Sequence, residues 1–283
     1  MERLIISFVL FTIMPKTREK PEIILHVGMH KTGTTFFQWN VFHYLDINYL
    51  WHVFYKSWSK DLLDPSKKVD IEKIKENFSK ILNKDKINLI TEENIYTYQF
   101  SKEDDRFIIL DRIKQVFPEA KIIFGTRKRD ENLISWYVEY VAVGGILDFQ
   151  GFLDKHMNLE KLNYEPYIKK LKDYYGEKNV FVYSLEELKK NQGQVVKKMC
   201  EFMNVNIPKK YRSKPARVGY GQGILKLSLF LNRFFKTPLN KKGIIPCWGP
   251  ILPQNILFHS FIVRFIPQKR ITLEFLKNLE FNF

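Results

Sequence analysis

Cysteine is scarce in this chain: Cys200 and Cys247 are the only two among 283 residues. Two cysteines so far apart supply neither the ligand pairs of a zinc site nor a disulfide framework, so we expect no metal and a reducing compartment. Cys200 lies in an apolar helical pattern and is expected in the core. The fold must then be held by that core, which a chain of this length can form.

Long apolar runs are lacking as well. The run from Leu4 to Met14 is shorter than the roughly 20 residues that a helix needs to cross a bilayer. It also lacks the small-residue cleavage site of a signal peptide. Two interpretations stay open: the run is an extension upstream of the true start, or it is a weak anchor on a membrane surface.

Acidic residues are outnumbered, with 31 Asp and Glu against 46 Lys and Arg, which gives a formal net charge of +15. This balance favours anionic partners such as nucleotides, acidic glycans or anionic lipid. The basic residues are spread along the chain in pairs such as Lys189–Lys190, which is typical of solvated helix faces. Because no helix-turn-helix, zinc-finger or RNA-recognition motif accompanies them, we expect no nucleic-acid partner.

Short apolar runs alternate with longer helical patterns, which predicts a parallel sheet with crossover helices. The predicted strands cover residues 23–27, 50–54, 87–91, 121–125 and 180–183. The predicted helices cover residues 34–44, 69–82, 102–117, 131–143, 163–175, 194–203 and 224–235. We expect an N-terminal extension over 1–20 and a single domain over 21–283. Its core would span 21–205, and 206–283 would form a C-terminal cap or acceptor region.

The most informative motif runs from residue 23 to residue 35: a buried strand, a turn with two glycines, and a helix start rich in threonine. Glycine lets backbone N–H groups approach an anion, the helix N-terminus adds partial positive charge, and Lys31 adds a full charge. The motif is therefore predicted to be a cradle for a phosphate-like anion. Its expected contacts are His30, Lys31, Thr32, Gly33, Thr34 and Thr35.

The cradle departs from the loop that binds nucleoside triphosphates. Gly28 and Gly33 keep the glycine spacing of that motif, but Thr34 stands where the motif has lysine, and Lys31 precedes the second glycine. No apolar strand ends in an aspartate that would obviously hold Mg²⁺. A nucleotide-dependent kinase is therefore the alternative and not the first choice.

The string Lys-Thr-Gly-Thr-Thr after a strand resembles the 5′-phosphosulfate-binding loop of the sulfotransferase family, and within it the carbohydrate branch. The resemblance implies an α/β, P-loop-like three-layer fold, with a mostly parallel central sheet and helices on both faces. It also implies 3′-phosphoadenosine 5′-phosphosulfate (PAPS) as donor and no required metal. A strand–helix–helix segment over 180–203 is similar to the end of that family's core, so the resemblance spans about residues 21–205.

A second motif supports the resemblance. The predicted strand 121–125 delivers Arg127 at its carboxyl end, and Ser135 follows eight residues later on the next helix. Ligands of open α/β sheets bind at such strand ends, and in this family an Arg and a Ser with this spacing hold the donor's 3′-phosphate. Arginine suits the task because its fork donates two parallel hydrogen bonds to phosphate. A weaker likeness near Arg217 suggests a basic loop over the same phosphate.

The reaction implied by the resemblance needs a cation on the leaving side and a base on the acceptor side. Lys31 is the candidate cation. Glu93, which follows the predicted strand 87–91 beside Glu92, is the first candidate for the base, and His52 is the rival. The alternative is that the two glutamates simply form an ordinary acidic helix start.

Aromatic residues make up 15% of the chain, and Trp136 and Tyr137 fall near the expected donor edge. Either ring would be able to stack on adenine or on a sugar, although core packing is the commoner fate of such residues.

Taken together, the resemblance implies a sulfotransferase that moves a sulfuryl group from PAPS to a hydroxyl or amine, with carbohydrate as the first choice of acceptor. The alternatives are the kinase and a non-catalytic polyanion-binding protein, which the net charge of +15 suggests. The expected setting is the cytoplasm of a bacterium, with the N-terminal apolar run as a weak membrane contact. The sequence indicates no oligomeric state.

Overall fold

A computed structural model of the chain describes residues 20–97, 100–211, 220–246, 266 and 269–279. The expected N-terminal extension, with its apolar run, lies outside the described residues except for Lys20, and Arg217 lies outside them too. None of the helices in the described ranges is long and apolar enough to cross a membrane.

The centre of the molecule is a five-stranded sheet in which every pair of neighbouring strands is parallel. Its strand order is β2-β3-β1-β4-β5. The strands are β1 (Ile23–Gly28), β2 (Asn48–Trp51), β3 (Asn88–Thr91), β4 (Lys121–Thr126) and β5 (Val180–Ser184). All five lie where the apolar runs predicted strands. The second is shifted from its expected range 50–54: it begins at Asn48 and ends at Trp51. It ends there because His52 adopts a left-handed backbone at φ 60° and the chain turns into a 3-10 helix, Val53–Tyr55.

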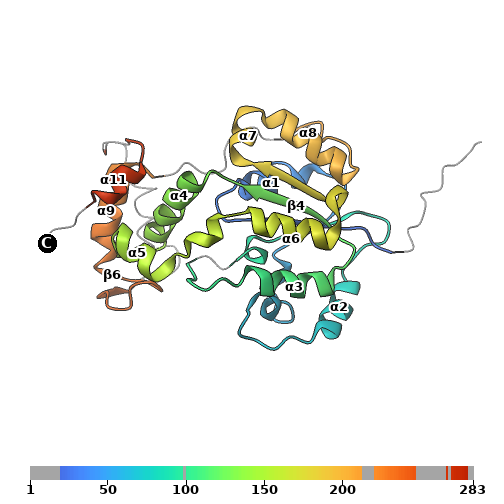
Figure 1. Cartoon of the computed structure of the whole chain (residues 1–283), viewed down its shortest axis with the longest axis horizontal. Coiled ribbons are helices and arrows are strands. Elements are labelled where there is room, and N and C mark those ends of the chain that lie inside the picture. The colour runs from blue at the N-terminus through green and yellow to red at the C-terminus, as the bar shows by residue number, and fades with distance from the viewer. Residues whose placement is uncertain (1–19, 98–99, 212–219, 247–265, 267–268, 280–283) are drawn as a thin grey trace, which may run out of the picture.

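Helices cover both faces of the sheet, which confirms the predicted three-layer α/β architecture (Figure 1). One face is covered by α1 (Thr34–Asn40), α7 (Leu185–Lys190) and α8 (Gln192–Met203). The other is covered by α2 (Ile71–Ser79), α3 (Arg106–Val116) and α6 (Glu165–Tyr175). The alternation along β1 matches these layers: Ile24 packs into the core under α1 and α8, whereas Leu25 and Val27 pack into the core on the opposite face.

A further group of helices gathers at one end of the molecule (Figure 1). They are α4 (Arg129–Ala142), α5 (Phe149–His156), α9 (Gln222–Asn232) and α11 (Leu273–Lys277), with a two-stranded sheet of β6 (Phe235–Lys236) and β7 (Ile245–Pro246) beside them. The sequence patterns indicated neither α5 nor α11. Both are short. Helix α11 packs on α4 and α5, and the phenylalanines of α5 pack against tyrosines of α4, so a single-segment pattern shows little of either helix.

Two predicted helix ends illustrate the local rules. Helix α6 ends before Gly176, as expected, because that glycine adopts φ 85°, a backbone that other residues rarely take. The predicted helix 34–44 ends early instead, at Asn40, and a 3-10 turn, Phe42–Tyr44, follows. Phe42 there packs edge-on against His26 of β1, with ring centres 5.1 Å apart, so a core contact takes precedence over helix continuation.

Candidate functional site

The turn between β1 and α1 forms a tight cradle at the carboxyl edge of the sheet. Lys31 and Gly33 both have left-handed backbones, at φ 70° and 93°. A Cβ on Gly28 would lie 2.9 Å from the Thr34 methyl group, so only glycine fits there without a shift. Thr32 is fully buried and donates a hydrogen bond of 2.6 Å to the carbonyl of Met29, which fixes the turn from inside.

Lys31 pairs with a carboxylate that the sequence patterns did not single out. Its Nζ lies 2.6 Å from Oε2 of Glu139 on α4, and the two side chains are 28% and 25% exposed. Glu139 stands one helical turn after Ser135, and this i,i+4 spacing was the signal available in the sequence. The cradle cation is therefore held in place by a residue 108 positions away.

Glu93 also reaches the cradle. It belongs to the short 3-10 helix η4 (Glu93–Ile95) after β3, and its Oε1 accepts a short hydrogen bond from the Thr34 hydroxyl. Its Oε2 lies 2.7 Å from Nδ1 of His30. The structure thus brings Lys31, Thr34, His30 and Glu93 together in one place.

Both ring nitrogens of His30 lie next to side-chain oxygens. Nδ1 faces the Glu93 carboxylate, and Nε2 lies 3.2 Å from the side-chain oxygen of Asn94. The amide of Asn94 is oriented by Glu92, which accepts from its nitrogen at 2.9 Å. Burial lowers the pKa of His30, but Glu93, Glu92 and Asn94 together raise it by more, so the net pKa lies above the usual value of 6.5.

Glu92 has a different environment from its neighbour. It is buried, and it accepts hydrogen bonds from both the backbone and the side-chain nitrogen of Asn94. Burial is the main reason that its pKa is raised. Glu92 therefore shapes the loop after β3, whereas Glu93 points to the cradle.

Arg127 connects the two sequence motifs. It follows β4 directly, and its Nη1 donates to the carbonyl of Lys31 at 3.2 Å, so the arginine lies against the cradle turn. Its side chain is only 13% exposed and approaches Glu131 at 3.7 Å. Burial lowers its pKa, which the nearby carboxylate of Glu131 partly offsets. Its Nε is buried and has no hydrogen-bond partner within the part of the chain that the structure describes.

Ser135 lies between the two contacts that α4 makes with this site. Glu131, Ser135 and Glu139 follow one another at four-residue steps and so share a face of the helix. Glu131 contacts Arg127, and Glu139 contacts Lys31. All three side chains are partly exposed, so Ser135 faces the same space as the two cations.

A buried polar network inside the sheet connects β1 to β3 and β5 next to the cradle. His26 of β1 has Nδ1 3.0 Å from the Thr91 hydroxyl and Nε2 3.2 Å from the Tyr183 hydroxyl. Full burial lowers the pKa of His26 to about 4, so the ring is neutral near pH 7. The Tyr183 hydroxyl would lie 2.6 Å from a Cβ on Gly125, so glycine is required in β4 for this close packing.

Three expected site residues lie elsewhere. His52 is exposed at the end of the edge strand β2, where its ring stacks on Trp51 at 4.1 Å, and it makes no hydrogen bond to the cradle within the described residues. Trp136 and Tyr137 are fully buried in the core, so the idea that they stack on adenine or sugar is wrong. Trp136 instead donates to the carbonyl of His30 and so holds the cradle turn against α4.

Thr35, the last of the expected cradle contacts, is partly exposed in the first turn of α1.

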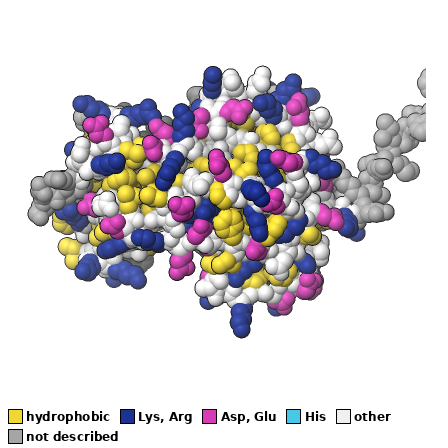
Figure 2. All heavy atoms as spheres, viewed as in Figure 1, with side chains coloured by type: hydrophobic (Ala, Val, Ile, Leu, Met, Phe, Trp, Pro, Cys, Tyr) yellow, Lys and Arg dark blue, Asp and Glu magenta, His cyan; other side chains and the backbone are white. Residues whose placement is uncertain are grey.

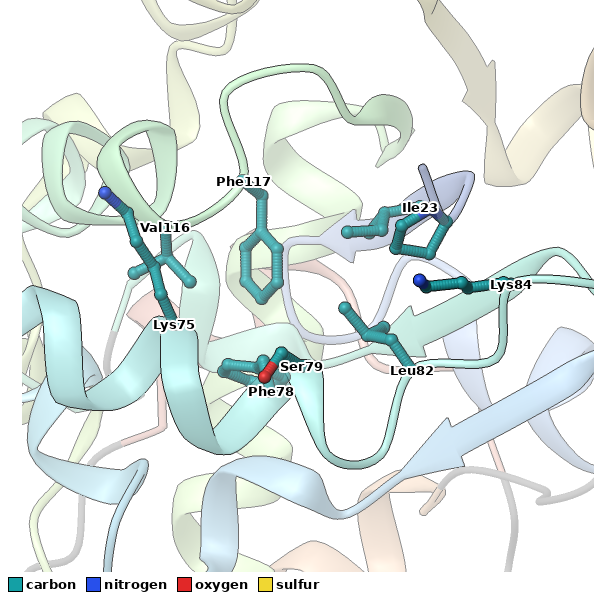
Figure 3. Close-up of a pocket in the computed structure, with 9 residues that line it drawn as sticks. Ile23, Lys75, Phe78, Ser79, Leu82, Lys84, Val116 and Phe117 are labelled. Carbon is teal, nitrogen blue, oxygen red and sulfur yellow. The ribbon is translucent and has the colours of Figure 1, made fainter. Parts of the chain in front are cut away.

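Two other kinds of site are relevant in the part of the chain that the structure describes: a metal centre and an apolar pocket. No group of three or more His, Cys, Asp or Glu side chains in the described ranges is placed to hold a metal ion. A pocket of about 150 Å³ lies at the amino end of β1, between α2 and α3 (Figure 3). Ile23, Phe78 and Phe117 line it, so it stands at the opposite edge of the sheet from the cradle.

The known proteins to which this chain is similar are sulfotransferases. The family model of a sulfotransferase domain matches residues 21–216. No curated protein sequence matches the chain. Among solved structures, a sulfotransferase from Alicyclobacillus acidocaldarius is similar at 16% identity and a TM-score of 0.49, over 75% of this chain and 90% of that one. A mouse sulfotransferase complexed with PAP is similar at 19% identity and a TM-score of 0.43, over 67% and 60%.

Proposed function

Because this chain belongs to the sulfotransferase family, we propose that it transfers a sulfuryl group from PAPS to a hydroxyl or amine of a carbohydrate. The observation that carries the choice of donor is the contact between the two motifs. Arg127 lies against the Lys31 carbonyl, so each of the two motifs brings a cation to the same tight turn. A nucleotide with phosphate groups at both 5′ and 3′ positions would need such a pair.

The residues present fit this donor at both ends. Lys31, Thr34 and the backbone of the turn would hold the 5′-phosphosulfate. Arg127 and Ser135 would hold the 3′-phosphate, and the buried Nε of Arg127, which lacks a partner among the described residues, is a donor that this phosphate would satisfy. The fit is therefore based on atoms of this chain as well as on the family.

Lys31 is proposed to assist the leaving group. The acceptor oxygen or nitrogen bonds to sulfur as the bond from sulfur to the bridging oxygen breaks, and the electron pair stays on the 5′-phosphate. A lysine ammonium near that oxygen stabilises the charge that develops there. Since Lys31 lies 2.6 Å from Glu139, it must exchange this carboxylate for the donor, and the flexible side chain allows that movement.

Glu93 is proposed to take the acceptor's proton. Its carboxylate lies in the cradle beside Thr34, whereas the rival His52 stacks on Trp51 at an exposed edge. His30, which donates to the other oxygen of Glu93, holds the carboxylate in one orientation. Glu92 is less suited, because it is buried and its hydrogen bonds go to Asn94 and not to a cradle side chain.

The alternatives receive less support. A kinase would need a carboxylate for Mg²⁺, and the acids nearest Lys31 and Thr34, Glu139 and Glu93, are each paired with a cradle side chain. A polyanion binder would favour one continuous basic surface. On the face in Figure 2, Lys and Arg side chains are scattered among acidic ones.

The test is a transfer assay with PAPS labelled in its sulfuryl group, run with EDTA and a panel of oligosaccharides. We expect release of adenosine 3′,5′-bisphosphate (PAP) and label in a saccharide, with no need for Mg²⁺. Labelling of small alcohols or phenols but of no saccharide would move the acceptor to another class. Phosphoryl transfer from ATP with Mg²⁺ would replace the proposal by the kinase.

A further inference from the structure

A cluster of aromatic rings lies at the surface beside the cradle and has no part in the site described above. We call it the aromatic platform. It consists of Trp39, His43, Tyr49, Trp51, His52 and Tyr55. Trp39 meets Trp51 edge-on at 4.8 Å, and His52 stacks on Trp51 at 4.1 Å and contacts Tyr55 at 5.0 Å.

The platform is exposed although its rings are large. Trp39 is 51% exposed and Tyr55 is 66% exposed, and both histidines of the platform are exposed as well. Its inner end is fixed to the core, because Tyr49 contacts the buried Phe42 at 5.9 Å. Rigid aromatic groups grouped at a surface are typical of interaction sites, whereas scattered single ones need no explanation.

Two elements of the fold connect the aromatic platform to the cradle. Trp51 is the last residue of β2 and pairs in register with Thr91, two residues before Glu93. Trp39 belongs to α1, the helix that begins at Thr34 of the cradle. A molecule lying on the platform would therefore extend toward the residue proposed as the base.

The side chains of the aromatic platform indicate which class of ligand it would bind. Asp46 is the only Asp, Glu, Lys or Arg between residues 39 and 55, and it pairs with Lys86. In a chain of net charge +15, the lack of Lys and Arg within this segment does not suit a phosphate-rich ligand. Flat aromatic faces with indole, imidazole and phenol groups at their edges suit pyranose rings, whose C–H faces stack and whose hydroxyls form hydrogen bonds.

We propose that the aromatic platform binds pyranose rings of the saccharide acceptor and so positions the chain beside Glu93. This inference rests on the proposed transfer to a carbohydrate. It adds a stacking site outside the cradle that determines which acceptors are used.

The experiment measures saccharide and donor binding separately on the full chain. Trp39→Ala, Tyr55→Ala and the double variant are compared with the wild type, and Tyr44→Ala is the control, because Tyr44 is 45% exposed in the same segment but outside the platform. The probes are tetrasaccharides of heparosan, galactan and β1,4-linked N-acetylglucosamine. Binding is followed by saturation-transfer NMR, and PAP binding by calorimetry.

We expect wild type and Tyr44→Ala to bind at least one tetrasaccharide, and each platform variant to bind it about five- to tenfold more weakly. The acceptor KM should rise by a similar factor with kcat and PAP affinity nearly unchanged, and Trp39→Phe should restore part of the loss. Unchanged saccharide binding in the double variant would overturn the inference while leaving the donor proposal intact. Loss of self-association, or of binding to phosphatidylcholine vesicles, with no change in saccharide binding would also overturn it. A wild type that fails to bind PAP would instead contradict the proposed function.

Discussion

Replacing Arg127 by alanine should remove recognition of one phosphate and little else. The Arg127 side chain is 13% exposed, so a phosphate bonded to it would be partly shielded from water. Truncating one partner of such a pair costs about 2–4 kcal/mol, equivalent to about 30- to 900-fold in the dissociation constant. The variant also loses the bond to the Lys31 carbonyl, which contributes about 1 kcal/mol and affects every ligand of the cradle.

These two losses can be separated with two ligands. PAP carries the 3′-phosphate, and adenosine 5′-phosphosulfate does not. Calorimetry on Arg127→Ala should show the large loss for PAP only, and a loss of about fivefold for adenosine 5′-phosphosulfate. The control is Arg129→Ala, which removes the same charge from an exposed position two residues away. Equal losses for both ligands, or an equal effect of the control, would refute the assignment of Arg127 to the 3′-phosphate.

Three further predictions concern the cradle and its support. Lys31→Ala should lower kcat by about 10²–10³, because the negative charge that Lys31 stabilises on the leaving phosphate develops mainly in the transition state. Lys128→Ala, at an exposed position, is the control, and equal kcat in both variants would contradict the role of Lys31 in assisting the leaving group. Glu93→Gln should lower kcat by about 10²–10⁴ with PAP affinity nearly intact. Glu92→Gln should lower kcat less, because glutamine can still accept hydrogen bonds from Asn94. A larger loss of kcat in Glu92→Gln than in Glu93→Gln would reassign the base. His26, with its pKa lowered to about 4, binds a proton only in the unfolded chain between pH 4 and 6.5, so the free energy of unfolding should fall by up to about 3 kcal/mol as pH drops through that window. Urea unfolding of His26→Gln should lack this component, and a wild-type slope retained in the variant would show that another group titrates.

Much of the fold follows from local pattern. Apolar runs gave all five strands of the sheet, because parallel strands covered on both faces are continuously apolar. Gly176 marked the end of α6 through its positive φ. The string around Gly33 located the cradle, since a turn that tight requires particular residues.

The rest depends on contacts between distant segments. The ion pair between Lys31 and Glu139 forms only once α4 packs across the cradle, and no local pattern contains that geometry. Strand order places β2 at an edge, so His52 is exposed there and not at the cradle, although its sequence position resembled that of a site residue. Trp136 looked available for stacking but is buried, because helix periodicity does not show which side of α4 faces the core.

The central claim is that the cradle and Arg127 together bind a nucleotide phosphorylated at both the 5′ and 3′ positions. Thermal unfolding with PAP, and separately with ATP or GTP and Mg²⁺, tests it most directly. At 100 times its dissociation constant, PAP should add about 2.7 kcal/mol to the free energy of unfolding, which raises Tm by about 4–5 °C for a chain of this size. ATP and GTP should shift Tm far less at the same concentration. Stabilisation by ATP with Mg²⁺ equal to or greater than that by PAP would contradict the account.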